Sequence, residues 1–137
     1  MKGPLEGLLV LDMTRVLAGP YCTMILSDLG ARIIKIEPPG GDDSREFGPF
    51  IKNTSAYFAS LNRGKESITA NIKEPKDSSL IKNIILNADV YIQNLAPGAA
   101  ERAGLGSKLM RKMNPELITC DISGYGSEGN YSDMKAY

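Results

Sequence analysis

The pattern of apolar and polar residues over the first forty positions predicts one β-α-β unit. An apolar run over 7–11 leads into a small-residue turn, after which apolar side chains recur at helical spacing. The recurring positions on one helical face are Tyr21, Met24, Ile25 and Leu29. A run rich in β-branched residues over 33–37 stops at the Pro-Pro-Gly-Gly of 38–41 and predicts a strand. This order predicts two parallel strands joined by a right-handed crossover, with helices packed against a sheet.

Three residues mark the ends of the expected helix. Gly19 lets the backbone approach a neighbour closely, Pro20 has the φ angle suited to a first helical position, and Gly30 suits a helix C-terminus. A turn from a strand into a helix points backbone N–H groups beyond the carboxyl end of the strand. We therefore expect the stretch 11–21 to line a ligand site.

The remaining sequence repeats the alternation of strand and helix. The expected elements, in order, are a strand at 67–71, a helix at 75–87, a strand at 90–92, a helix that restarts at Pro97, a helix at 107–113 and a strand at 117–122. The apolar positions of the two longer helices are Leu80, Ile81, Ile84, Ile85 and Ala88, and then Leu109, Met110 and Met113. Strands that alternate with helices four times predict one α/β domain over residues 1–137, with a mainly parallel sheet.

Residues 38–56 interrupt this alternation. Their Pro, Gly, Asp and Asn content predicts a long surface loop. Such a loop in a compact domain either has a functional role or is a plain solvated excursion, and the sequence leaves both open. Residues 56–61 follow it as a short helical turn or an extended piece.

Ligands of open parallel sheets bind at the carboxyl ends of the strands. The four segments expected there are 14–18, 71–73, 94–96 and 123–126. Basic residues in or near them are available to meet phosphates, although a single basic residue is more often only solvated. These residues are Arg15, Lys73, Arg102 and Lys135. The residues of a GxGxxG pattern occur at 124–129, but no helix is predicted after them, as the dinucleotide-binding fingerprint requires, and the GxxxxGK[ST] phosphate loop is absent, so the residues alone predict an α/β coenzyme-binding domain of another kind.

Composition narrows the choice of partner. The 16 basic and 16 acidic residues cancel and form no long block, which gives no support for nucleic acid or an anionic membrane surface as a partner. We expect a small molecule or another chain instead. The sequence has no histidine and no CxxC pair, so Cys22 and Cys120 predict two buried, reduced thiols and no metal site. No apolar run approaches the ~20 residues that span a bilayer, and no signal-peptide core is present, so we expect a cytoplasmic protein.

Short motifs along essentially the whole chain, in order and with few gaps, resemble the N-terminal part of the class III CoA-transferases. The motifs are Pro4-Leu5-Glu6-Gly7, Leu11-Asp12-Met13-Thr14-Arg15, Ala18-Gly19-Pro20, Asp28-Leu29-Gly30-Ala31, Lys35-Ile36-Glu37-Pro38-Pro39-Gly40-Gly41-Asp42, Asn62-Arg63-Gly64-Lys65, Ala88-Asp89-Val90, Pro97-Gly98, Gly104-Leu105-Gly106, Asn114-Pro115 and Ser123-Gly124-Tyr125-Gly126. Together they are highly specific to that family.

The resemblance implies a fold, a ligand and a partner. In that family the large domain is Rossmann-like, two chains interlock into a homodimer, and coenzyme A is a substrate and not a prosthetic group. The substrates are an acyl-CoA and a carboxylic acid. The positions that match the family's CoA contacts are Leu17, Ala18, Ala70, Asn71, Ile72, Lys73, Asn94, Leu95, Ala96, Arg102, Met134, Lys135, Ala136 and Tyr137. The resemblance places Arg102 beside the adenine and phosphate end of CoA.

Two positions depart from the family member that uses formyl-CoA. That enzyme has a glutamine in the place of Leu17 and an arginine in the place of Pro38, so neither a formyl-type acyl group nor the arginine contact is expected here. The apolar Leu17 favours a larger or less polar acyl group, unless it only packs against its neighbours.

The family mechanism uses an aspartate nucleophile, which the alignment places a few dozen residues after Tyr137. The aspartate attacks the acyl-CoA thioester, and an aspartyl-CoA thioester later passes CoA to the acceptor acid, so that one hard transfer becomes several easier steps. Asp12 and Asp89 are interpreted as turn or helix-contact residues. We assign no catalytic residue within 1–137 and expect the isolated chain to be inactive.

Two alternatives remain. The racemase branch of the family uses acid-base chemistry and has a histidine where Tyr137 stands here, so a chain without histidine favours the transferase. The chain could also be a non-catalytic CoA-binding or interaction fragment, whether a truncated or proteolysed product or a module in its own right. An isolated piece of this kind leaves a sheet edge and a helix-packing surface uncovered, and should dimerise, aggregate or depend on another chain.

Overall fold

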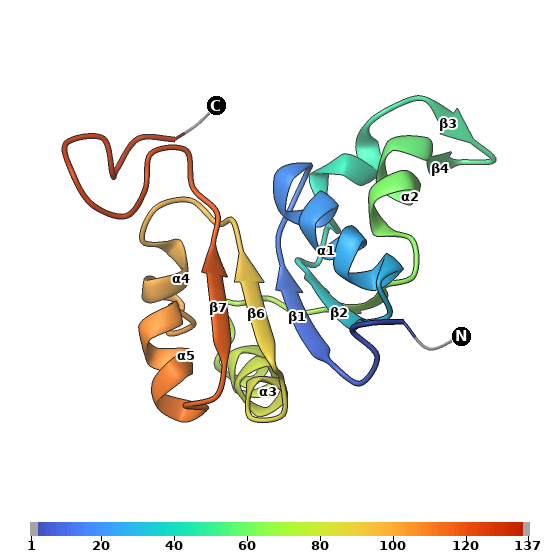
Figure 1. Cartoon of the computed structure of the whole chain (residues 1–137). Helices are drawn as coiled ribbons and strands as arrows, with labels where there is room; N and C mark the ends of the chain where they lie inside the picture. The colour runs from blue at the N-terminus through green and yellow to red at the C-terminus, as the bar shows by residue number, and fades with distance from the viewer. Residues whose placement is uncertain (1–2, 136–137) are drawn as a thin grey trace.

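A computed structural model describes residues 3–135 of the chain and shows a five-stranded parallel sheet (Figure 1). The strand order is β5-β2-β1-β6-β7, and each pair of neighbours in this sheet is parallel. The strands are β1 Leu9–Met13, β2 Arg32–Glu37, β5 Glu66–Thr69, β6 Val90–Gln93 and β7 Ile118–Asp121. This arrangement confirms the predicted α/β fold with a mainly parallel sheet.

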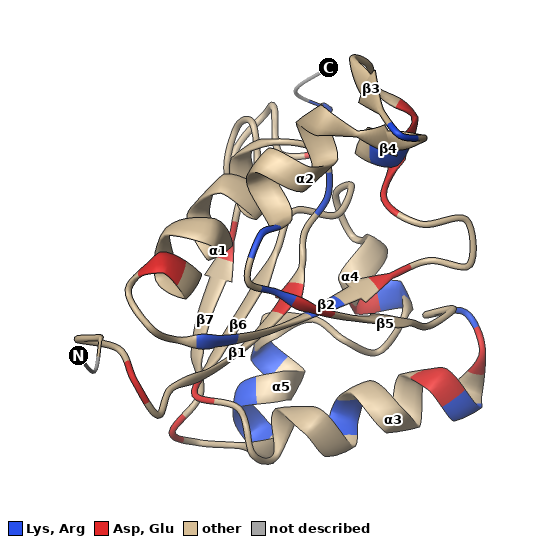
Figure 2. Ribbon diagram, turned by 90° about the vertical axis from the view of Figure 1, so that its right-hand side faces the viewer, with Lys and Arg blue, Asp and Glu red and all other residues tan. Residues whose placement is uncertain are grey.

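Helices cover both faces of the sheet. They are α1 Ala18–Asp28, α2 Ala56–Asn62, α3 Pro75–Ile85, α4 Ala99–Arg102 and α5 Ser107–Met113. Figure 2 shows α1 and α2 on one side of the sheet and α3 and α5 on the other. Side chains of the central strand β1 alternate between these layers: Leu11 and Met13 pack with α3 and α5, and Val10 packs on the α1 side.

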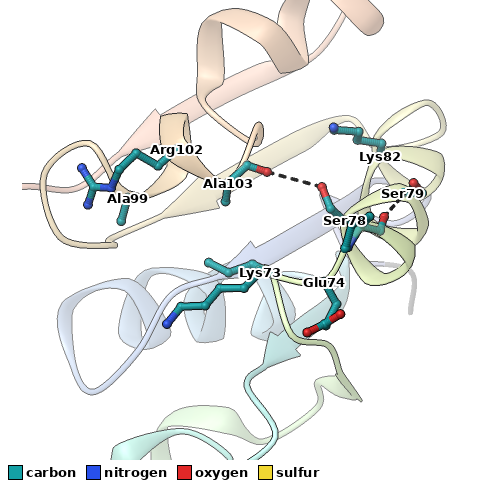
Figure 3. Close-up of a pocket in the computed structure, with 10 residues that line it drawn as sticks. Lys73, Glu74, Ser78, Ser79, Lys82, Ala99, Arg102 and Ala103 are labelled. Atoms are coloured by element: carbon teal, nitrogen blue, oxygen red, sulfur yellow. Dashed lines mark hydrogen bonds between the residues drawn. The ribbon is translucent and has the colours of Figure 1, made fainter.

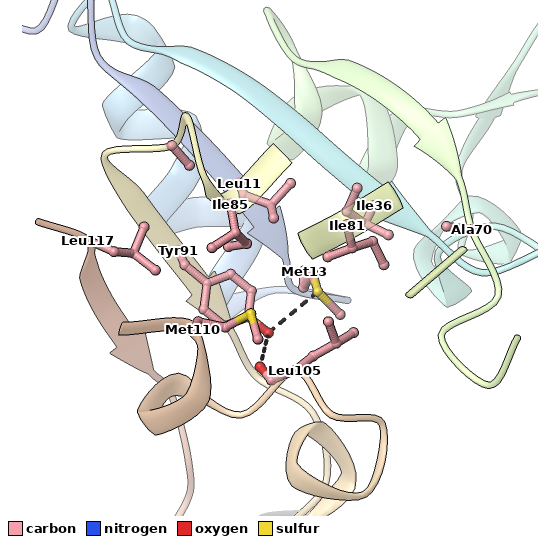
Figure 4. Packing of buried hydrophobic residues seen from close by; sticks show 11 residues of the cluster. Leu11, Met13, Ile36, Ala70, Ile81, Ile85, Tyr91, Leu105, Met110 and Leu117 are labelled. Carbon is pink, nitrogen blue, oxygen red and sulfur yellow. Dashed lines mark hydrogen bonds between the residues drawn. The ribbon is translucent and has the colours of Figure 1, made fainter. Parts of the chain in front are cut away.

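The larger core cluster lies between the sheet and the layer of α3 and α5 (Figure 4). Ile81 and Ile85 of α3 and Met110 of α5 are fully buried there. Tyr91 of β6 is also fully buried, and its hydroxyl donates a hydrogen bond to the Leu105 carbonyl at 2.9 Å. Burial, together with the charges of nearby carboxylates, raises the pKa of the Tyr91 hydroxyl well above its ordinary value.

The helix α1 differs from its prediction in two ways. It begins at Ala18, so Pro20 is its third residue and not its first. A proline is tolerated there because the first-turn N–H groups have no partner within the helix. Of the four predicted apolar positions only Met24 is buried, while Tyr21, Ile25 and Leu29 are exposed.

Small residues explain this reversal. The buried residues of α1 are Gly19, Pro20, Thr23 and Met24, and three of these four are small. A Cβ atom on Gly19 would lie 2.2 Å from Thr14 Cβ, so the helix packs against the strand-to-helix turn by its backbone. The expected close approach at Gly19 is confirmed, whereas the expected apolar face is wrong.

The segment 38–56 is mostly exposed, as predicted for a surface loop, but it is not without regular structure. The segment holds a 3₁₀ turn, η1 Asp43–Glu46, and a hairpin of β3 Phe50–Ile51 and β4 Thr54–Ser55, which leads into α2 (Figure 1). The buried Ser55 hydroxyl donates to the carbonyls of Ser44 at 2.9 Å and Phe47 at 2.5 Å. These bonds anchor the hairpin, so the segment is no plain solvated excursion.

Other elements agree with the predictions to within one to three residues. The helix expected at Pro97 begins at Ala99, because Gly98 caps it in the left-handed region with φ +69°. Leu80 of α3 and Leu109 of α5 were expected in the core but are exposed, since each lies beside the apolar stripe of its helix and not within it. Their neighbours Ile81 and Met110 pack into the larger core cluster instead.

Cys22 and Cys120 are free thiols, but they are half-buried where full burial was expected. Both pack against the cluster on the α1 side of the sheet. Burial and the neighbouring Cys120 raise the pKa of the Cys22 thiol.

No helix within residues 3–135 has the length and apolar character needed to cross a membrane. Over the same residues, His, Cys, Asp and Glu side chains form no cluster of three that could hold a metal ion.

Candidate ligand site

Two adjoining cavities lie where the segments after the parallel strands come together. The smaller, of about 300 Å³, is lined from the ends of β1, β2, β5 and β6, and includes Arg15, Pro38 and Leu95. The larger, of about 600 Å³, lies between the start of α3 and α4. Both cavities are lined by Ile72 and Lys73, which follow β5. Together they form one elongated site at the carboxyl edge of the sheet, as the rule for open parallel sheets predicts.

Three cations line the larger cavity (Figure 3). Lys73 precedes α3, Lys82 lies on α3, and Arg102 is the last residue of α4. None of them forms an ion pair with a carboxylate within residues 3–135. Arg102 makes only long contacts, of 3.5 Å, to the Pro97 carbonyl. The carboxylate of Glu74 lines the same cavity, so the three cations outnumber it and the lining suits a ligand that carries several negative charges.

The structure brings some of the predicted contact residues together and leaves others apart. Those that line the two cavities are Ala70, Asn71, Ile72, Lys73, Leu95 and Arg102. Leu17 and Ala18 are exposed at the start of α1 and line neither cavity. Met134 and Lys135 are exposed near the C-terminus and also lie apart from them. Ala136 and Tyr137 lie outside the described residues.

Asn94 and Ala96 lie in the segment between β6 and α4. The side chain of Asn94 is occupied by the turn after β1, because its Oδ1 accepts from the Arg15 N–H at 2.8 Å and its Nδ2 donates to the Arg15 carbonyl at 2.9 Å. Asn94 thus fixes the backbone at Arg15, whose guanidinium is half-exposed and lies 3.8 Å from Asp43. Only the backbone of Asn94 is left for a ligand.

Sequence reasoning missed Lys82 and the serines beside it. Pro75, Ser78, Ser79 and Lys82 all line the larger cavity. Their spacing of three and four residues places them on one helical face, and that spacing is visible in the sequence. The missing information was which face of α3 meets α4, because the segments that enclose the cavity are far apart along the chain.

Side chains from β2 and from the segment after it hold the strand-to-helix turn on the side opposite Asn94. Lys35 Nζ donates to the Thr14 carbonyl at 2.8 Å, and the Val16 N–H donates to Asp42 Oδ1 at 3.2 Å. Lys35 Nζ also lies 2.8 Å from Asp42 Oδ2 in an ion pair, and each of the two side chains is only 1% exposed. Hydrogen bonds from Lys35 and Ser44 outweigh the opposing effect of burial and lower the pKa of Asp42.

Asp12 lies at the centre of a second buried group. Its carboxylate accepts from the Thr14 N–H at 2.9 Å and the Thr23 hydroxyl at 2.6 Å, and Lys65 Nζ donates to it at 3.2 Å. Burial lowers the pKa of Lys65. Asp12 is fully buried and saturated by these donors, so it acts as a turn and helix contact. Asp89, at the other end of the sheet, accepts from the Leu9 N–H at 2.7 Å, which fits the same interpretation.

Glu37 ties the end of β2 to the segment that follows. Burial would raise its pKa, but hydrogen bonds from Arg45, from Ser67 and from the Asp42 N–H prevail and lower it to about 2. The contacts with Arg45 are bidentate, at 2.7 and 2.6 Å. The carboxylates of Asp12, Glu37 and Asp42 are therefore fixed as acceptors in structural bonds. Among the described carboxylates, that of Glu74 lines the larger cavity.

Known proteins resemble this chain in sequence and in fold. Residues 5–137 match the sequence model of CoA-transferase family III. The acetyl-CoA:oxalate CoA-transferase of Acetobacter aceti is 48% identical over 99% of the chain, and the succinyl-CoA:glutarate CoA-transferase of Mus musculus is 48% identical over 98%. A CAIB/BAIF family protein from Brucella suis has a similar crystal structure, with a TM-score of 0.94, 39% identity and coverage of the whole chain. The chain spans 35%, 31% and 38% of the lengths of these three proteins.

Proposed function

Because the chain belongs to CoA-transferase family III, we propose that it binds coenzyme A as the CoA-binding part of an acyl-CoA:carboxylate CoA-transferase. The observation that carries the proposal is the cavity of about 600 Å³ between α3 and α4 with its three unpaired cations. Coenzyme A bears a diphosphate and a 3′-phosphate, so its adenosine end presents several negative charges to such a site. It is a substrate here and no prosthetic group is proposed.

The proposed contacts follow the elongated shape of the site. Arg102 and Lys73 take the adenine and phosphate end, since both line the larger cavity. The chain of CoA then passes along the smaller cavity toward the turn after β1, where Leu17 and Ala18 stand exposed. The remaining proposed contacts are Ala70, Asn71, Ile72, Asn94, Leu95, Ala96, Met134, Lys135, Ala136 and Tyr137.

The proposed chemistry uses an aspartate nucleophile that lies outside the described residues. An aspartate beyond Tyr137 attacks the acyl-CoA carbonyl, which forms a mixed anhydride and releases CoA thiolate. The thiolate attacks the aspartyl carbonyl, which gives an aspartyl-CoA thioester and frees the donor acid as its carboxylate. The acceptor carboxylate and the thiolate then repeat the two steps in reverse, which yields the new acyl-CoA and regenerates the aspartate.

We propose short dicarboxylic acids as substrates, because oxalate and glutarate stand in the names of the two curated relatives. The proposal also includes a homodimer and a cytoplasmic location. A racemase is less well supported, because the chain has no histidine and acid-base exchange of an α-proton near neutral pH suits that side chain best.

Binding is tested by calorimetric titration of the 137-residue chain with CoA. We expect saturable binding that Arg102→Ala weakens by about tenfold, the equivalent of one lost charge-assisted contact. Lys76→Ala, which removes the same charge from α3 outside both cavities, is the matched control and should bind as the parent does. Equal loss in both variants, or no binding by the parent chain, would contradict the proposed site.

Activity is tested in two forms of the protein. The chain 1–137 alone should transfer no CoA from succinyl-CoA to glutarate, whereas the complete product of the reading frame that encodes it should do so. Transfer by the chain alone that a single internal Asp→Asn change abolishes would refute the assignment of the nucleophile. A complete product that exchanges the α-proton of an acyl-CoA without transferring CoA would favour the racemase.

A further inference from the structure

We propose that Lys35 and Asp42 act as positioning residues, which together hold the turn at 14–16 in the shape that presents Leu17 and Ala18 to the ligand. The pair is called the Lys35–Asp42 clamp below. The ligand-related part of this inference rests on the proposed function, whereas the effect of the clamp on the turn stands on the contacts alone.

The clamp binds the backbone of the turn at two points. Lys35 Nζ donates to the Thr14 carbonyl at 2.8 Å, and Asp42 Oδ1 accepts from the Val16 N–H at 3.2 Å. The ion pair, at 2.8 Å, joins the two side chains to each other. Lys35 comes from β2 and Asp42 from the segment after it, so the clamp reaches the turn from one side only. Asn94 holds Arg15, between the two clamped residues, from the other side.

Val16 shows that the turn needs such support. Its φ is +66°, in the left-handed region that β-branched side chains avoid because Cβ crowds the backbone. A strained conformation of this kind persists only when the surrounding structure fixes it. The residue that follows, Leu17, is the N-cap of α1 and makes no side-chain capping bond, so the start of the helix has no support of its own.

A purely stabilising role does not account for a buried ion pair. Both side chains are only 1% exposed, and two charges buried in this way commonly contribute no more to stability than an apolar pair of similar volume. What an apolar pair cannot do is donate to the Thr14 carbonyl and accept from the Val16 N–H. Asp42 also accepts from the Ser44 N–H at 3.0 Å and hydroxyl at 2.7 Å, which fixes its own orientation.

The test separates the shape of the turn from the stability of the fold. Lys35→Met combined with Asp42→Leu removes both charges without leaving either one unpaired. Amide hydrogen exchange of Arg15 and Val16 in the 137-residue chain should accelerate by at least about tenfold, while the amide of Tyr91 in β6 stays protected. Calorimetry should show that the affinity for CoA falls by about tenfold or more.

Two further variants control for instability and for charge. Ile33→Ala truncates a fully buried side chain of the same strand and should speed exchange broadly, without a selective effect at Val16. Lys35→Met combined with Asp42→Asn keeps an oxygen acceptor for Val16 and Ser44 but loses the donor to the Thr14 carbonyl, so it should speed exchange at Val16 and weaken CoA binding less than the first double variant does. If the first variant does not fold, this milder one carries the test, and it should show the same selective effect with a smaller magnitude.

Each outcome decides the proposal. Selective exchange at Arg15 and Val16 with loss of CoA affinity supports it. Unchanged exchange at Val16, or faster exchange with unchanged affinity, overturns it, and so does unfolding of both double variants, because the pair would then serve the fold as a whole. If the parent chain binds no CoA, the proposed function fails together with the ligand-related part, while the exchange data still show whether the clamp holds the turn.

Discussion

The turn after β1 and the segment after β7 leave the same edge of the sheet, but they are held in opposite ways. Lys35, Asp42 and Asn94 bond to the backbone of 14–16 from both sides. Within the described residues, the hydrogen bonds of 123–135 join that segment only to itself. Its side chains are nearly all exposed, and Tyr125 and Tyr131 contact each other with ring centroids 6.0 Å apart.

The candidate site therefore has two unlike parts. The turn at 14–16 is held in place before any ligand binds, whereas the segment 123–135 gains little support from the sheet. A ligand that meets the fixed turn has little protein motion to arrest, whereas contacts with Met134 or Lys135 require that the segment first be ordered. The strong part of the site should therefore lie near β1, β5 and α4. The predictions below test the two regions against each other.

The largest expected effect is that of Lys35→Met. The change leaves Asp42 as a buried, unpaired carboxylate and should lower the free energy of unfolding by about 3–5 kcal/mol. Lys135→Met, the matched change in the exposed segment, should shift it by no more than about 0.5 kcal/mol. Urea unfolding followed by circular dichroism measures both. A loss below about 1 kcal/mol for Lys35→Met would show that the two regions do not differ in the way we describe.

Acidification should weaken the bonds around the turn after β1 before it affects the segment after β7. Glu37 has its pKa lowered from 4.5 to about 2, so its contribution is complete above pH 4.5 and disappears as the pH falls through 2. The lost contribution is on the order of 3 kcal/mol, at 1.36 kcal/mol per pKa unit. Unfolding curves recorded at a series of pH values should show this fall in the parent chain and a much weaker one in Glu37→Gln. Parallel curves for both proteins would contradict it.

Gly19→Ala should destabilise the chain by about 2 kcal/mol, because the added Cβ would lie 2.2 Å from Thr14 Cβ and force α1 away from the turn. Gly126→Ala is its counterpart in the other region. That glycine has φ +86° but no atom near its Cβ position, so only backbone strain of about 1 kcal/mol applies. Thermal unfolding compares the two; an equal or larger loss for Gly126→Ala would reverse the order.

The smallest expected effect is that of Tyr131→Ala. The residue is 63% exposed and its ring contacts that of Tyr125, so truncation should change the free energy of unfolding by less than about 0.5 kcal/mol. The Tm from the same thermal scans measures it. A loss comparable to that of Gly19→Ala would mean that the segment after β7 packs more firmly than its exposure indicates.

Local patterns predicted the sheet and two of its helices well, because each strand and its following helix are encoded in adjacent residues. Periodicity placed α5 at 107–113 and α3 from Pro75 onward. It failed for α1, because three of its four buried residues are Gly19, Pro20 and Thr23, while three of the four predicted apolar positions are exposed. A rule that places large apolar residues in the core cannot detect a helix that packs by close approach of its backbone.

The buried ionic contacts escaped prediction for a different reason. Lys35 stands in a β-branched strand and Asp42 in a polar segment, and nothing in either neighbourhood indicates that both lose contact with water. Their partners lie at residues 14 and 16, more than twenty positions away. The hairpin at 50–55 was not predicted, because its tight turn depends on positive φ angles at Lys52 and Asn53. Composition does not reveal these angles and indicates only a loop.

The buried hydroxyl of Tyr91 gives this protein a built-in optical probe. The chain has no tryptophan, so its near-ultraviolet circular dichroism arises mainly from tyrosines, and Tyr91 is the described tyrosine that is fully enclosed. Its bond to the Leu105 carbonyl locks the ring in one asymmetric setting. The near-ultraviolet circular dichroism signal of tyrosine should therefore report whether β6 and the segment before α5 remain in contact, in any variant of the chain and without an attached label.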